Sequence, residues 1–370
     1  MFASRNFLFA KAAAALAAGN KLFMWGRNNY GQLGQGNTTN QSSPVQVGAL
    51  TNWSTLSASY HVLCVKNNSE LWAWGNNAAG RLGIGNTSNR SSPVQVGALT
   101  NWKTPSAGKN FSMCVKTDGS LWSWGQNNYG QLGQNNVSNL SSPVQVGSLS
   151  TWNKPCIGSV NGHFLCTTTN GQLFAWGLNA NGQLGLGDTT NRSSPVQVGA
   201  LTNWATSTAA DYTSLCVKTD GTLWAWGDGT FGRLGLGNTT SYSSPVQVGS
   251  DVDWATPSAS TEFSLCVKTT GSLWAWGRNI NGQLGQGNTT NRSSPVQVGS
   301  LTNWATPVSA WKSSGCSKTD GTLWRWGLND YGQLGLGNTT NYSSPKQVGA
   351  LTSWTQPSNS ASYSMGCLQA

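Results

Sequence analysis

A tryptophan-glycine pair recurs seven times along the chain at intervals of 49 to 52 residues. The tryptophans of these pairs are Trp25, Trp74, Trp124, Trp176, Trp226, Trp276 and Trp326. A fixed period of this length means that one supersecondary unit is repeated, and that each unit buries its apolar face by stacking on its neighbours. A length of 370 residues would ordinarily suggest two or three domains. The repeat instead predicts one domain over residues 20–370, preceded by an arm at residues 1–19.

Each repeat is expected to consist of short β-strands. In the second repeat, residues 71–75 alternate with period two, residues 94–96 follow a Ser-Ser-Pro segment, and residues 113–115 form an apolar run before an Asp-Gly turn. Trp102 is assigned to the connection before that third strand, and the Asp-Gly pair predicts a tight primed turn. No convincing 3.6-residue apolar period occurs beyond Lys21. Small sheets at this spacing predict an all-β fold, a β-propeller.

The two ends of the repeat region complement each other. A cysteine-bearing strand recurs at Cys64, Cys114, Cys166, Cys216, Cys266, Cys316 and Cys367. The last of these has no Trp-Gly strand after it, and the first Trp-Gly strand, residues 21–26, has no cysteine strand before it. Pairing the two removes two unpaired sheet edges. We therefore expect a closed seven-bladed propeller in which both termini complete one blade.

The repeat resembles that of the regulator of chromosome condensation family. The resemblance rests on Gly130-Gln131-Leu132-Gly133 following Trp124-Gly125, on the Ser-Ser-Pro-Val-Gln-Val segment and on the Thr-Asp-Gly turn. It implies a seven-bladed propeller over about residues 20–370. Members of the family include the eukaryotic exchange factor for the GTPase Ran and a secreted bacterial inhibitor of β-lactamases. The resemblance is therefore specific for fold and weak for function.

The eight cysteines do not predict a disulfide framework. Seven occupy equivalent positions in successive repeats, where their Cα atoms should lie beyond the ~7 Å limit for a bridge. They are expected to be free, buried and apolar in character. Cys156 stands at the position of Ser106 and could pair only locally. No zinc-ligand spacing occurs, so no metal site is predicted.

The net charge of +10 could attract nucleic acid or an acidic partner. One repeat position carries Lys66, Lys116, Lys218, Lys268 and Lys318, so these lysines should be spread around the ring. No dense basic run occurs, and nucleic acid is therefore a disfavoured partner. The charges are interpreted as a solvated set or, alternatively, as a surface for an acidic partner.

Groups for catalysis are few. His61 and His163 each precede a repeat cysteine by three residues, two repeats apart, and are interpreted as structural. Asp118, Asp220 and Asp320 belong to hairpin turns. No nucleophile, paired-carboxylate or phosphate-binding motif is present, and the Gly-rich segments open no helix. The sequence predicts a protein that is not an enzyme and needs no cofactor.

Departures from the repeat indicate where a partner could bind. Of 20 tryptophans, 19 belong to two recurring series and are expected in the core, leaving Trp311 outside both. The loop before each cysteine diverges most, and loops on a rigid scaffold commonly carry recognition. The candidate partner-binding residues are Tyr60, Lys109, Tyr212, Glu262, Trp311 and Lys312. Neutral drift in tolerant loops is the alternative explanation.

The arm at residues 1–19 is apolar and alanine-rich. Phe2, Phe7 and Phe9 are candidates for assembly contacts with a partner or a neighbouring copy. The arm is too short for a membrane span and makes a poor secretory signal, because Lys11 interrupts it. A cytoplasmic or virion-associated location is therefore favoured over secretion.

Three functions remain open. The first is a non-enzymatic protein-binding or structural module, such as a component of a phage virion. The second is guanine nucleotide exchange, against which no interval has room for an inserted wedge and the arm holds only Arg5 and Lys11 as basic residues. The third is a secreted inhibitor or lectin-like binder.

Overall fold

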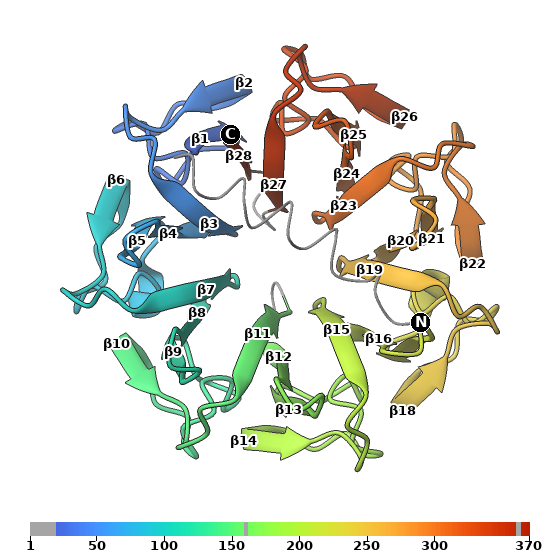
Figure 1. Ribbon diagram of the computed structural model, residues 1–370, viewed down its shortest axis with the longest axis horizontal. Helices are drawn as coiled ribbons and strands as arrows, with labels where there is room; N and C mark the ends of the chain where they lie inside the picture. Colours follow the sequence, from blue (N-terminus) through green and yellow to red (C-terminus); the bar gives the residue numbers. More distant parts are fainter. Residues whose placement is uncertain (1–19, 159–161, 360–363) are drawn as a thin grey trace, which may run out of the picture.

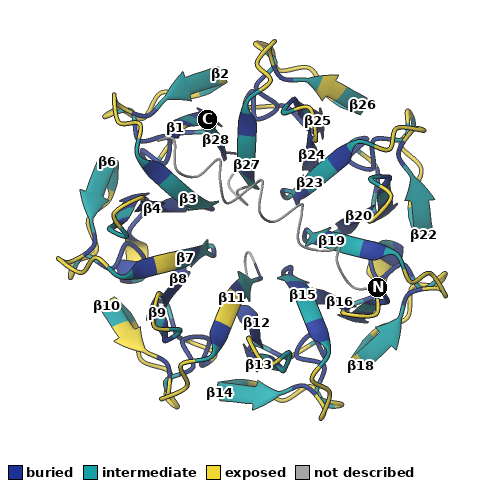
Figure 2. Cartoon of the chain, in the orientation of Figure 1, coloured by how far each residue is buried: buried dark blue, intermediate teal, exposed yellow. Residues whose placement is uncertain are grey.

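The computed structural model describes residues 20–158, 162–359 and 364–370, which form seven four-stranded antiparallel sheets around a central axis (Figure 1). The predicted all-β, seven-bladed propeller is therefore confirmed. Blades 1 to 6 are β3–β6, β7–β10, β11–β14, β15–β18, β19–β22 and β23–β26, and blade 7 consists of β27, β28, β1 and β2. In Figure 2 the exposed positions gather mostly in the loops at the rim.

The strands occupy four concentric positions. The innermost strands are β3 (Trp53–Ala58), β7 (Trp102–Ala107), β11 (Trp152–Ile157), β15 (Trp204–Ala209), β19 (Trp254–Ala259), β23 (Trp304–Ser309) and β27 (Trp354–Asn359). The second are β4 (His61–Lys66), β8 (Phe111–Lys116), β12 (His163–Thr168), β16 (Thr213–Lys218), β20 (Phe263–Lys268), β24 (Ser313–Lys318) and β28 (Ser364–Gln369). The third are β5 (Leu71–Gly75), β9 (Leu121–Gly125), β13 (Leu173–Gly177), β17 (Leu223–Gly227), β21 (Leu273–Gly277), β25 (Leu323–Gly327) and β1 (Lys21–Gly26). The outermost are β6 (Arg90–Gln95), β10 (Leu140–Gln145), β14 (Arg192–Gln197), β18 (Tyr242–Gln247), β22 (Arg292–Gln297), β26 (Tyr342–Gln347) and β2 (Gln41–Gln46).

Two local predictions were wrong. Trp102 does not lie in a connection but begins β7, an innermost strand that the sequence did not reveal. These strands face the axis with Thr, Pro, Ser and Ala, so they lack the apolar alternation that marks the others. In the turn after β8, Gly119 takes a φ of 79° while Asp118 does not enter the left-handed region, so the turn is not of the primed type.

Blade 7 is completed by both ends of the repeat region, as predicted. Strand β1 pairs with β28 from Lys21 opposite Gln369 to Gly26 opposite Ser364. Strand β28 also pairs with β27, and β1 with β2. Met365, Cys367 and Leu368 of β28 are fully buried. The ring is therefore closed by hydrogen bonds between segments about 340 residues apart in sequence.

The Gly-x-Leu-Gly segments join each blade to the next. The Trp74 indole Nε1 donates to the Gln32 carbonyl oxygen of the preceding blade at 3.1 Å. A Cβ on Gly34, whose φ is +71°, would lie 2.8 Å from that nitrogen, so only glycine fits. The bond recurs at all seven junctions with lengths of 2.9 to 3.1 Å. The motif therefore serves blade docking.

The recurring lysines are not solvated, and this interpretation was wrong. Lys116 is 5% exposed, and its Nζ lies 3.6 Å from the Trp122 ring centroid and 4.7 Å from that of Trp102. The other four lysines make equivalent cation–π contacts. In blade 3, Thr168 replaces the lysine and Phe174 the tryptophan. These lysines therefore make packing contacts within their blades.

The cysteines and aspartates behave as the sequence predicted. All eight cysteines are free, and the seven repeat cysteines are buried, which raises the pKa of each thiol. Cys156 donates its S–H to the Ser207 carbonyl oxygen at 2.9 Å. Asp118 accepts the Ser120 backbone N–H within its hairpin. The tryptophans of the Trp-Gly pairs and those that begin the innermost strands are at most 4% exposed.

Both histidines are buried structural groups. His163 Nε2 lies 2.9 Å from Ser214 Oγ, which donates to the Gln183 carbonyl oxygen, so the histidine must be the donor. His61 bonds Ser112 in the same way. Burial lowers the pKa of His163 to about 3. Its Nδ1 has no partner among the described residues, so a second proton would be buried unpaired.

Acid is therefore expected to destabilise the fold through these histidines. An unfolded histidine binds its proton near pH 6.5, whereas folded His163 binds it near pH 3. The contribution of His163 to the free energy of unfolding is therefore complete above pH 6.5 and is lost progressively as the pH falls toward 3. At pH 4 the loss is roughly 3 kcal/mol for His163. His163→Phe, which copies Phe111, should reduce the loss of urea-derived stability between pH 7 and 4 by roughly 3 kcal/mol, while buried His61 still contributes its part. An unchanged pH profile would contradict this assignment.

In blades 6 and 7, the large and the small residue of one packing pair exchange strands. Facing positions on the second and third strands hold a large and a small residue in blades 1 to 5, such as Leu63 opposite Ala73. Blade 6 has Gly315 opposite Arg325, and blade 7 has Gly366 opposite Met24. Arg325 is 1% exposed, and burial lowers its pKa to about 9. The glycines make room, since a Cβ on Gly315 would lie 2.6 Å from Arg325 Cδ.

The arm residues Phe2, Phe7 and Phe9 lie outside the described residues. Within the described part of the chain, no helix combines the length and apolar character needed to cross a membrane.

Candidate interaction face at the channel mouth

The loops between innermost and second strands meet around one end of the central axis. A cavity of about 320 Å³ follows this axis and is lined by all seven innermost strands. The innermost strands point toward the axis at their C-terminal ends (Figure 1). Ser59, Ser260 and Trp311, in the loops that follow three of these strands, also line the cavity. We call these loops, together with the loops that follow the third strands, the channel-mouth face.

All six candidate partner-binding residues lie on this face and are half-buried. Tyr60 and Lys109 belong to blades 1 and 2, and the Lys109 Nζ lies 5.5 Å from the Tyr60 ring centroid. The other four lie on blades 4, 5 and 6 and are Tyr212, Glu262, Trp311 and Lys312. The Lys312 Nζ lies 4.5 Å from the Trp311 ring centroid. The structure therefore divides the candidates into groups on blades 1 and 2, on blades 4 and 5, and on blade 6.

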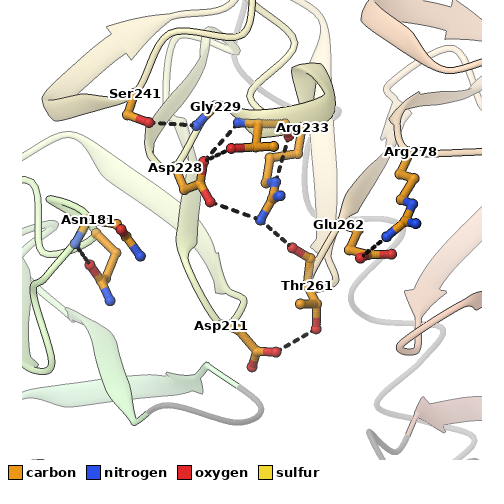
Figure 3. Close-up of polar contacts among 11 residues, drawn as sticks. Asn181, Asp211, Asp228, Gly229, Arg233, Ser241, Thr261, Glu262 and Arg278 are labelled. Carbon is orange, nitrogen blue, oxygen red and sulfur yellow. Dashed lines mark hydrogen bonds and ion pairs between the residues drawn. The ribbon is translucent and has the colours of Figure 1, made fainter.

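The group on blades 4 and 5 is a hydrogen-bonded network in which both arginines have carboxylate partners (Figure 3). Arg233 pairs with Asp228 at 3.4 Å and donates to the Thr261 carbonyl oxygen at 2.8 Å. The Thr261 hydroxyl donates to the Asp211 carboxylate at 2.5 Å, and Glu262 pairs with Arg278. Burial lowers the pKa of Arg233, and the carboxylates of Asp228 and Glu262 oppose this shift.

The group on blades 1 and 2 is cationic and aromatic. Arg81 is 4% exposed and donates to the carbonyl oxygens of Ala78 at 2.8 Å and Lys109 at 2.6 Å. Burial lowers its pKa to about 10. Burial, Tyr30 and the Asp211 carboxylate raise the pKa of Tyr60, whereas the charges of Arg27 and Arg81 lower it. The Tyr30 and Tyr60 ring centroids lie 6.3 Å apart, so the group extends to blade 7.

The sequence analysis missed both central arginines. Five Gly-x-Leu-Gly segments carry Gln at the variable position, and two carry Arg81 and Arg233. That substitution was the available signal. The described residues contain no cluster of three or more His, Cys, Asp or Glu side chains that could hold a metal ion. The face offers cations, carboxylates and aromatic rings for non-covalent contacts.

The comparisons agree with this architecture. Human WBSCR16 superposes with a TM-score of 0.84 at 19% identity, covering 95% of this chain and 98% of that one. Prp20p from Saccharomyces cerevisiae gives 0.84 at 17% identity, covering 97% and 94%. A search of curated proteins finds no significant match. The regulator of chromosome condensation (RCC1) repeat matches residues 20–65, 68–115, 118–159, 170–217, 220–267, 270–311 and 320–366. These matches span most of the chain, which therefore belongs to the regulator of chromosome condensation (RCC1) repeat family.

Proposed function

We propose that the protein is a non-enzymatic module that binds another protein through its channel-mouth face. The observation that carries the proposal is that the six residues departing from the repeat in the divergent loops all lie on this one face. None of the six side chains recurs in every blade, so packing within an average blade does not require them. Half-buried aromatic and charged residues on a rigid scaffold suit an interface.

The structural neighbours support a protein partner. Yeast RCC1 (Prp20) has been crystallised with Kap60 bound to it, and Prp20p from Saccharomyces cerevisiae is described as binding Gsp1p and histones. The likeness at 17 to 19% identity supports only the fold, so the partner here has to be found directly. The proposal includes a cytoplasmic or virion-associated location and incorporation into an assembly such as a phage particle. In that setting Phe2, Phe7 and Phe9 are proposed assembly contacts.

Trp311 provides the test of the proposed face. Trp311→Ala is expected to weaken partner binding about tenfold or more, because a truncated interface tryptophan commonly costs at least ~2 kcal/mol. The tagged full-length variant and the wild-type protein are compared by quantitative mass spectrometry of proteins captured from the native source. The matched control is Leu301→Ala in the same blade, because Leu301 is 47% exposed at the opposite end of β23.

Two results would contradict the assignment. Equal capture by Trp311→Ala and the wild-type protein would remove the channel-mouth face as the binding surface. A lower thermal midpoint in Trp311→Ala would show instead that this ring contributes to packing.

Nucleotide exchange on a small GTPase is the second candidate, favoured by the similarity to Prp20p, which binds Gsp1p. It is tested by release of a fluorescent guanine nucleotide from a Ran-type GTPase. We expect no acceleration by the full-length protein. Acceleration at stoichiometric concentration would replace the non-enzymatic proposal.

A further inference from the structure

Arg81 and Arg233 occupy the same repeat position but have different surroundings. Around Arg233 stand three carboxylates, those of Asp211, Asp228 and Glu262. At the equivalent positions around Arg81, the chain has Ser59, Asn76 and Asn110. The carboxylates of one junction are thus all replaced by neutral groups at the other.

Two further cations, Lys109 and Arg27, lie near Tyr60, the tyrosine on which the Arg81 charge also acts. Lys109 replaces Thr261 of the other junction, and its Nζ lies over the Tyr60 ring. Arg27 acts on the same Tyr60 from the blade 7 side and stacks on Tyr331 at 5.3 Å. Among the described residues, none of these three cations forms an ion pair. The Arg81 charge is therefore held almost out of water without a counter-charge, which is costly.

We propose that Arg81, Lys109 and Arg27 form a carboxylate-binding site that recognises an acidic segment of the partner protein. This inference rests on the proposed function and adds the chemistry of the partner. A guanidinium has five N–H donors, and the Arg81 hydrogen bonds to Ala78 and Lys109 use Nε and Nη1. Carboxylates supply both the missing charge and acceptors for the remaining donors. Tyr30 and Tyr60 provide apolar surface beside the charges.

A short acidic segment fits this face better than a nucleic acid. A nucleic acid is held by a row of cations that follows its phosphates. Here the three cations are confined to blades 7, 1 and 2, and the network on blades 4 and 5, with three carboxylates against two arginines, offers an extended polyanion no net positive charge. A segment with a few carboxylates can occupy the cationic side alone.

The probe is a fluorescein-labelled peptide with four consecutive glutamates, titrated with the full-length protein and followed by fluorescence anisotropy. Binding is expected to weaken with added salt. Arg81→Gln should weaken it about tenfold, because one charge-assisted hydrogen bond contributes about that factor. Arg81→Gln restores the residue found in five other repeats, and the Arg81 carbonyl that accepts the Trp124 indole is retained, so folding should persist.

The matched control is Arg233→Gln, which alters the equivalent junction and should leave peptide affinity within about twofold. Asn76→Asp, which copies Asp228, should weaken the peptide as Arg81→Gln does, by supplying an internal counter-charge. Circular dichroism melting shows that each variant is folded.

Three results would overturn the site. They are no peptide binding at low salt, equal losses in Arg81→Gln and Arg233→Gln, or tighter binding of a single-stranded oligonucleotide of equal charge. If native partner capture is lost in Trp311→Ala but unchanged in Arg81→Gln, the acidic-segment inference fails while the proposed protein-binding function stands.

Discussion

Removal of residues 364–370, which comprise β28 and Ala370, is expected to abolish cooperative folding of the whole ring. The deletion removes buried Met365 and Leu368, each contributing ~1.5–3 kcal/mol, together with the backbone hydrogen bonds to β1 and β27. These losses are comparable with the total stability of ~5–15 kcal/mol typical of a domain. Tryptophan near-ultraviolet circular dichroism and thermal melting measure the effect.

The control deletion removes Ala370 alone, which is exposed and lies beyond the last strand. It should melt within a few degrees of the full-length protein. A β28 deletion that melted like this control would show that the ring does not depend on the pairing of β1 with β28.

Gly315→Leu is expected to be strongly destabilising alone and tolerated together with Arg325→Ala. The new side chain would overlap buried Arg325, and overpacking of this kind costs ~1–3 kcal/mol. The double substitution recreates the Leu63–Ala73 pair of blade 1 and removes a buried charge. Its stability should therefore return to within ~1 kcal/mol of the wild-type protein.

Urea denaturation of the wild-type protein, both single variants and the double variant completes this thermodynamic cycle. The expected coupling between the two positions is ~2 kcal/mol or more in favour of the double variant. Additive effects would mean that Gly315 does not act as the space for Arg325.

The candidate site was only half visible in the sequence. Tyr60 and Glu262 were found because they interrupt a repeat, and a break in periodicity is readable without coordinates. Arg81 and Arg233 were missed because their meaning depends on the adjacent blade. Arg233 meets Thr261 and Glu262 of the next blade, whereas Arg81 meets Lys109. Nothing local to Arg81 indicates that its charge lacks a counter-charge.

The prediction that the recurring lysines are solvated was wrong for a related reason. Lys116 has the charge and spacing of a surface residue, and sequence alone assigns such a residue to water. In the fold its ammonium group lies against Trp122 and Trp102, which come from two other strands of the same blade. The sequence shows that blade 3 lacks both the lysine and the tryptophan. Only the strand order shows that these two positions lie side by side in the blade.

Repetition was sufficient to establish the blade number, the closure by both termini and the free cysteines, because each follows from counting equivalent positions along one chain. The innermost strands, the docking role of Gly34 and its equivalents, and the contrast between Arg81 and Arg233 were decided by tertiary structure. Each depends on which side chains of neighbouring strands or blades come within contact distance. A one-dimensional period specifies that the units stack, whereas charge compensation and steric fit arise only between the stacked units.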